Sequence, residues 1–125
     1  MIYKHYKSLI SITGTTLPGS TTTTVAAFNT AIGGQAILHG YLTVTDTNGA
    51  ATSDTDFFVN FAGQTFQITL DAALGASTKY FNIPIYFEYN NIPGSNYNLT
   101  INNSNGTTKN INTTYSRLNI RSVRI

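Results

Sequence analysis

The sequence has no cysteine, no tryptophan and few charged residues. Lys and Arg together number 7 and Asp and Glu number 5 among 125 residues, which gives a formal net charge of +2. Charged residues are 10% of the chain, whereas an ordinary domain has about 25%. Without cysteine there is no disulfide framework and no thiol nucleophile. The small net charge argues against strong phosphate binding, so we expect no nucleic acid partner.

Long apolar runs are also missing. No segment approaches the roughly 20 apolar residues that a membrane-spanning helix needs, so we expect no membrane partner. No apolar run near the start resembles a signal peptide, and we therefore expect a protein made in the reducing cytoplasm of its host. The residues that make the chain soluble are mainly Thr, Asn, Ser and Gly, which are uncharged. A surface of this kind suits copies that pack beside one another, because like-charge repulsion between them is small.

Short β-type runs alternate with turn signals along the whole chain. This pattern predicts an all-β fold, an antiparallel β-sandwich of about eight strands in one domain, residues 1–125. Eight antiparallel strands in two sheets are typical of a jelly roll. An immunoglobulin-like topology is the alternative, although the chain lacks its Cys…Trp…Cys signature.

Two long strands are predicted to be apolar on both faces. In residues 35–46, Leu38, Leu42 and Val44 point one way and Ile37, His39 and Tyr41 the other. Residues 79–89 repeat the pattern, with Tyr80 and Tyr86 opposite the apolar set. One face of each strand would meet the core and the other a neighbouring subunit. The candidate subunit interface is Ile37, His39, Tyr41, Tyr80 and Tyr86.

Three further features predict local structure. Pro84 has no N–H, so its strand should lie at a sheet edge or contain a bulge. Alternating apolar residues on both sides of Gly63-Gln64 predict a hairpin over residues 57–70. The apolar parity of the last strand changes after Ile120, which predicts a bulge near Arg121-Ser122.

Catalysis has little support in the sequence. His5 and His39 do not have a metal-ligand spacing, Glu88 is the only glutamate, and no Gly-x-Ser-x-Gly motif occurs. We expect no enzyme activity, no catalytic residues, no metal site and no cofactor. Asp46, Asp54 and Asp56 leave calcium open as an alternative to a solvated loop.

Basic residues gather near the two ends of the chain. If the first and last strands are neighbours, they would form a basic contact patch that could meet an acidic protein surface. The alternative is a scattered set of solvent-facing side chains. The candidate patch is Lys4, Lys7, Arg117, Arg121 and Arg124.

Tyrosines are numerous in the second half of the chain. They could stack on sugar rings or fill an interface, or they could pack in the core with the hydroxyl at its rim. The residues concerned are Tyr80, Tyr86, Tyr89, Tyr97 and Tyr115.

The C-terminal third, residues ~80–125, carries a family resemblance. It contains Ile92-Pro93-Gly94-Ser95-Asn96-Tyr97-Asn98-Leu99-Thr100-Ile101, then a polar stretch, then Ser116-Arg117-Leu118-Asn119-Ile120. A Pro-Gly turn before a Tyr-containing strand, followed by a closing Leu-x-Ile strand, resembles small virion proteins of tailed bacteriophages. Such modules are similar to the tumour-necrosis-factor-like jelly roll. The resemblance implies a homotrimer on the virion surface.

The leading functional hypothesis is therefore a phage structural protein located in the virion. It would be a capsid decoration or fibre-type subunit that acts through contacts with sister subunits and with the major capsid or other virion proteins. One alternative is a carbohydrate- or receptor-binding β-sandwich module that holds a host glycan. A bacterial surface appendage subunit is another alternative.

Overall fold

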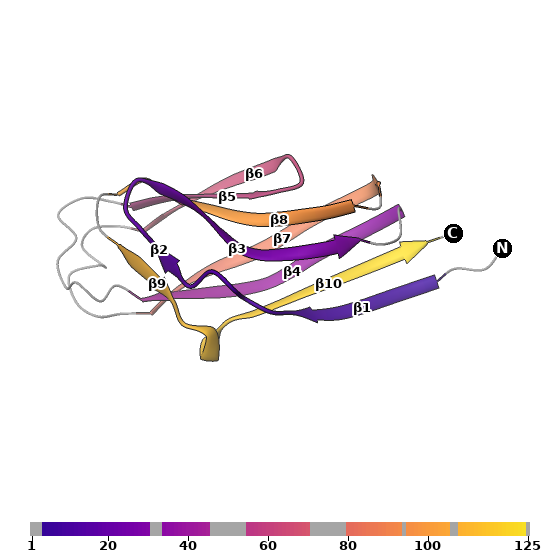
Figure 1. Ribbon diagram of the computed structural model, residues 1–125, viewed down its shortest axis with the longest axis horizontal. Coiled ribbons are helices and arrows are strands. Elements are labelled where there is room, and N and C mark those ends of the chain that lie inside the picture. The colour runs from indigo at the N-terminus through magenta and orange to yellow at the C-terminus, as the bar shows by residue number, and fades with distance from the viewer. Residues whose placement is uncertain are drawn as a thin grey trace.

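The protein forms two antiparallel β-sheets that face each other (Figure 1). The computed structural model describes residues 4–30, 34–45, 55–70, 80–93, 95–105 and 108–124. The first sheet contains β1 (Lys4–Ile10), β10 (Arg117–Arg124), β4 (Gly34–Thr45), β7 (Tyr80–Ile92), β9 (Lys109–Ile111) and β2 (Thr16–Leu17). The second sheet contains β3 (Thr21–Thr30), β8 (Ser95–Asn103), β5 (Thr55–Phe61) and β6 (Gln64–Leu70).

The strand pairing is that of a jelly roll. Apart from the short strands β2 and β9, the strands pair in a nested order from the two ends of the chain inwards. β1 pairs with β10, β3 with β8, β4 with β7, and β5 with β6. This nested order confirms the predicted antiparallel sandwich of about eight strands and excludes the immunoglobulin-like alternative. β2 and β9 are short additional strands, of 2 and 3 residues, that the sequence pattern did not indicate.

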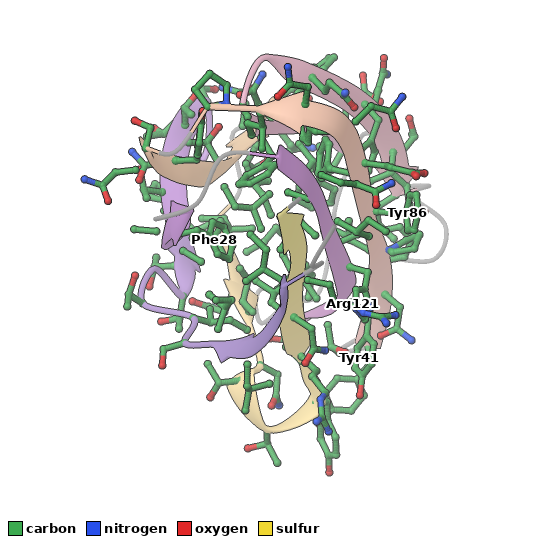
Figure 2. The ribbon with its side chains drawn as sticks, turned by 90° about the vertical axis from the view of Figure 1, so that its right-hand side faces the viewer. Phe28, Tyr41, Tyr86 and Arg121 are labelled. Carbon is green, nitrogen blue, oxygen red and sulfur yellow. The ribbon has the colours of Figure 1, made fainter. Side chains whose placement is uncertain are left out.

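Alternating side chains from both sheets form the core. In β5 the residues Phe57, Val59 and Phe61 are fully buried, while Phe58 between them is 37% exposed. Phe61 lies at the centre of an aromatic cluster, with ring centroids 5.2 Å from Phe28, 5.7 Å from Phe87, 5.8 Å from Tyr89 and 6.0 Å from Tyr97. Figure 2 shows Phe28 between the sheets. Each such side chain contributes about 1.5–3 kcal/mol through burial.

The predictions for Pro84 and for the hairpin are confirmed. Among the described residues β7 pairs only with β4, so Pro84 lies on an edge strand, where a missing N–H breaks no ladder. β5 and β6 form the expected hairpin, but the turn residues are Ala62 and Gly63, one position earlier than predicted. Both have positive φ, 47° and 85°, as a two-residue type I′ turn requires.

The predicted bulge near Arg121-Ser122 is wrong. β10 keeps a continuous register with β1 and with β4 through both residues. Because β10 is hydrogen-bonded on both sides, an extra residue there would disrupt two ladders at once.

Gly40 allows β10 to approach β4 closely. Its φ is +150°, and a Cβ atom at this position would lie 1.9 Å from the carbonyl oxygen of Arg117. Only glycine fits this contact, which brings the start of β10 against the middle of β4.

Helix is nearly absent from the part of the chain that the structure describes. One 3₁₀ turn, η1 (Thr113–Tyr115), joins β9 to β10. No described helix has the length and apolarity that a membrane crossing requires.

Candidate functional site

The site begins where two strands share one edge of β4. β10 pairs with residues 35–41 of β4, and β9 pairs with Val44 and Thr45. Between these two ladders the chain leaves the sheet as η1, which protrudes from the edge of the sandwich in Figure 1. The turn therefore lies beside Thr43, at the gap between the two ladders.

Asn112 and Ser116 hold η1 in place. The Asn112 side-chain Oδ1 accepts hydrogen bonds from the backbone N–H groups of Thr114 at 3.0 Å and Tyr115 at 3.3 Å, which is an N-terminal cap. The Ser116 hydroxyl donates to the Asn112 carbonyl at 2.6 Å and accepts from the Thr43 backbone N–H at 2.8 Å. The Asn112 N–H donates to the Thr43 carbonyl at 2.8 Å.

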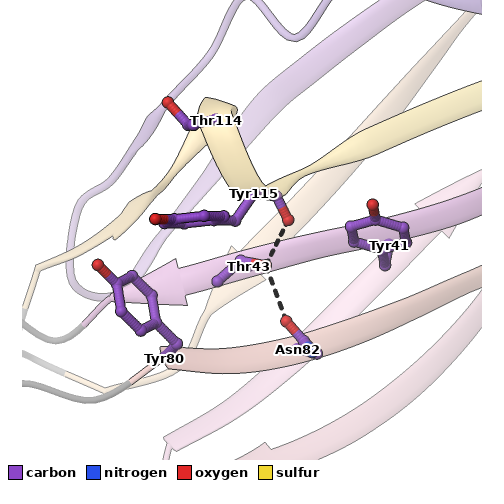
Figure 3. Close-up of a pocket in the computed structure, with 6 residues that line it drawn as sticks. All are labelled: Tyr41, Thr43, Tyr80, Asn82, Thr114 and Tyr115. Atoms are coloured by element: carbon purple, nitrogen blue, oxygen red, sulfur yellow. Dashed lines mark hydrogen bonds between the residues drawn. The ribbon is translucent and has the colours of Figure 1, made fainter.

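Thr43 joins the turn to the sheet through its side chain as well. Its Oγ1 lies 2.6 Å from the Tyr115 carbonyl oxygen and 2.8 Å from the Asn82 amide oxygen on β7 (Figure 3). A hydroxyl carries one hydrogen, so it donates to only one of these two oxygens at a time, and the other keeps its capacity to accept from a bound molecule. The buried Thr43 thus contacts Tyr115 on one side and Asn82 on the other.

These residues line a hollow of about 400 Å³ on the outer face of the first sheet. That volume is within the roughly 300–1,000 Å³ of small-molecule sites. Tyr80 and Tyr115 meet edge to face across one end, with ring centroids 5.4 Å apart and an interplanar angle of 76°. Tyr41 lies further along β4, as Figure 3 shows. The lining residues are Tyr41, Thr43, Tyr80, Asn82, Thr114 and Tyr115.

The hollow combines exposed aromatic rings with uncharged polar groups. Tyr41, Tyr80 and Tyr115 are 46%, 63% and 55% exposed, although large aromatic side chains are usually mostly covered. None of the described lining residues is charged. The Asn82 amide nitrogen and the three tyrosine hydroxyls have no hydrogen-bond partner among the described residues. Such a surface can hold a ligand that has both an apolar face and many hydroxyl groups.

The five residues predicted as a subunit interface do share the outer face of β4 and β7, but they do not form one cluster. Tyr41 and Tyr80 line the hollow. His39 pairs with Tyr86, and Ile37 with Glu88, towards the other end of the strands. Tyr80 and Tyr86 are separated by roughly 20 Å along β7 at 3.4 Å per residue. Figure 2 shows Tyr41, Tyr86 and Arg121 on the same side of the molecule.

The first and last strands are neighbours, which is the condition that the predicted basic patch required. Lys4 pairs with Arg124, and Lys7 with Arg121. Arg117 and Arg121 are exposed on the outer face of β10, and Arg117 pairs with Tyr41. Residues three apart in a regular strand point to opposite faces, so the Lys4–Arg124 pair and the Lys7–Arg121 pair occupy positions of opposite parity, and the single basic patch stays a prediction.

The predicted tyrosine set divides between surface and core. Tyr89 and Tyr97 pack against the core, and their hydroxyls donate to backbone carbonyls, that of Tyr89 to Phe61 and that of Tyr97 to Pro93 at 2.8 Å. Tyr80, Tyr86 and Tyr115 remain exposed. Sequence reasoning missed Thr43, Asn82 and Thr114. For Thr43 and Asn82 the only available signal was an outward position in an alternating strand, and Thr114 lies in the 3₁₀ turn η1.

The structure contains no cluster of metal ligands within the described ranges. Of the three aspartates considered for calcium, Asp46 and Asp54 lie outside these ranges. Asp56 accepts a hydrogen bond from the Thr69 hydroxyl at 2.6 Å.

Comparisons with known proteins assign no family. No protein-family model matches the chain, and no curated protein matches it. Among solved structures, an exo-β-1,3-galactanase from Phanerochaete chrysosporium aligns with 98% of this chain and 27% of its own, at 12% identity and a TM-score of 0.37. The C-terminal CBM6 of LamC, a laminarinase from Zobellia galactanivorans, aligns with 95% of this chain and 98% of its own, at 12% identity and a TM-score of 0.38. These values are too low to carry functional inference.

Proposed function

We propose that this protein is a carbohydrate-binding β-sandwich module, and that the hollow between Tyr41, Tyr80 and Tyr115 is its binding site. The observation that supports this proposal is the pairing of exposed tyrosine rings with a fixed, uncharged amide and hydroxyl set. A sugar ring presents an apolar C–H face and a rim of hydroxyls, and this lining complements both.

Preorganisation is a further argument for the site. The hydrogen bonds around Thr43 fix the Tyr115 backbone before any ligand arrives, so little conformational freedom of the backbone is lost on binding. The Asn82 side chain contacts the same Thr43 hydroxyl and lines the hollow.

A glycan array probed with the purified protein tests the proposal. We expect binding to at least one saccharide class, and a loss of roughly tenfold or more in affinity for Tyr115→Ala and Tyr80→Ala. Tyr86→Ala is the matched control, because Tyr86 is equally exposed (59%) on the same face but far from the hollow. Absence of glycan binding, or an equal loss in all three variants, would contradict the proposal.

A structural role through subunit contacts, including the predicted place in a phage virion, is the second candidate. Exposed apolar residues on the same sheet, away from the hollow, favour it: Leu9 is 66% exposed and Tyr86 is 59% exposed. His39 between them has a buried Nε2 atom with no hydrogen-bond partner among the described residues. Sedimentation equilibrium tests this candidate: a stable oligomer that Tyr86→Lys converts to monomer supports it, and a monomeric wild type at micromolar concentration contradicts it.

A further inference from the structure

Arg117 is the cross-strand neighbour of Tyr41, which lines the proposed sugar site. It is the first residue of β10, two positions after Tyr115, and pairs with Tyr41 across the β10–β4 ladder. Its neighbour in sequence, Leu118, and that of Tyr41, Leu42, are both fully buried. Since side chains alternate along a strand, the exposed Arg117 and Tyr41 side chains share the outer face and are cross-strand neighbours.

The charge of Arg117 is not neutralised by any described neighbour. No ion pair joins it to another described residue, and the described residues that line the hollow include no carboxylate. The acidic residue described on this face is Glu88, which pairs with Ile37 and accepts a hydrogen bond from the Tyr86 hydroxyl at 3.1 Å. Glu88 is four positions from Pro84, the partner of Tyr41 on β7, or roughly 13 Å along the strand.

The chemistry of this position favours an anionic ligand group. A guanidinium is always protonated and binds a carboxylate or a sulfate through two parallel N–H···O bonds. A sugar ring stacked on Tyr41 would lie beside Arg117, so that an acidic substituent of the ring could contact the guanidinium. Glu88 is too far away along β7 to compete for the guanidinium.

We infer that the site selects acidic saccharides, with Arg117 as the residue that contacts the carboxylate or sulfate of the sugar. This inference rests on the proposed carbohydrate function. The tyrosines and Asn82 would hold the ring of either a neutral or an acidic sugar, and Arg117 would determine the preference between them. Arg121 is on the same strand and face but four residues further on, beside Ile37, and takes no part.

Isothermal titration calorimetry with matched sugar pairs tests this assignment. One pair is trigalacturonic acid and its methyl ester, another is 3′-sialyllactose and lactose, and a third, galactose 3-sulfate and galactose, separates sulfate from carboxylate. In low-salt buffer we expect the acidic member of at least one pair to bind about tenfold or more tightly than its neutral partner, because a charge-assisted hydrogen bond is worth that much. Salt should weaken this preference.

Two variants make the result specific to Arg117. Arg117→Gln should bind both members of that pair with equal affinity, and Arg121→Gln should keep the wild-type preference. Equal binding of acidic and neutral sugars by the wild type, or a preference that survives in Arg117→Gln, would overturn the inference. Neutral sugar binding that Tyr115→Ala removes would still support the proposed function, so the two failures are distinguishable. Backbone pairing of β10 does not use the guanidinium, and circular dichroism verifies that both variants are folded.

Discussion

The Thr43 hydroxyl lies 2.6 Å from the carbonyl oxygen of Tyr115, a residue 72 positions further along the chain. This contact joins the 3₁₀ turn to the central strand β4, and it is made beneath the hollow that we assign to sugar binding. The position of Tyr115 therefore depends on a buried threonine that itself offers little surface to a ligand.

Removal of the Thr43 hydroxyl should loosen the turn. Thr43→Val keeps the shape of the side chain but leaves the buried contacts to Tyr115 and Asn82 unmade, and we expect the free energy of unfolding to fall by about 1–3 kcal/mol. Glycan affinity should fall as well, because Tyr115 and Asn82 lose their shared support. Urea denaturation measures the first effect, and Thr43→Ser, which retains the hydroxyl, is the control. Equal stability of Thr43→Val and the wild type would show that the contact contributes nothing.

Gly40→Ala should be severely destabilising. The new Cβ atom would lie 1.9 Å from the Arg117 carbonyl at a φ of +150°, so the β4–β10 ladder must separate. Gly63→Ala is the matched control, since its φ is +85° but no atom lies within 4 Å of the new Cβ, and about 1 kcal/mol of backbone strain is expected. Thermal unfolding should show a much lower Tm for Gly40→Ala than for Gly63→Ala. Similar Tm values would argue against the close approach.

Truncation of two phenylalanines on β5 should lower the stability by very different amounts. Phe61→Ala removes the centre of the aromatic cluster and should cost about 3–5 kcal/mol. Phe58→Ala, three positions earlier on the outer face, should cost much less because Phe58 is 37% exposed. Chemical denaturation of both variants checks the alternation of the strand. Comparable losses would mean that the assignment of inner and outer faces is incorrect.

Alkaline pH should destabilise the fold in part through Tyr89. Burial of the ring raises the pKa of Tyr89 above its ordinary value of about 10. The unfolded chain therefore loses this proton first, so the contribution is fully present below about pH 10 and is lost as the pH rises through the folded pKa. Tyr89→Phe should unfold with a shallower dependence on pH above 10 in denaturation series from pH 9 to pH 11. An unchanged slope would contradict this role.

The sequence pattern predicted the strands because their period of two is local. The alternation of Phe57, Val59 and Phe61, or of Leu38 and Leu42, is visible without knowledge of any partner. Pro84 predicted an edge strand or a bulge in the same local way, and the structure shows the edge strand.

The site could not be predicted in that way because it depends on register between distant segments. Thr43 is hydrogen-bonded to Asn82, 39 residues away, and to Tyr115, 72 residues away. In the sequence, Thr43 is simply a β-branched residue in a strand, and Tyr115 is one of several tyrosines. The topology of the jelly roll brings them together, and nothing local to either residue indicates the other.

The central claim is that the Tyr41–Tyr80–Tyr115 hollow binds saccharide, and titration of ¹⁵N-labelled protein with the tightest-binding glycan from the array tests it most directly. We predict saturable shifts of the backbone amide signals of Thr43, Asn82 and Tyr115. Shifts confined to the outer face of the opposite sheet, around Phe58 and Gln67, would contradict the account, as would the absence of any saturable shift.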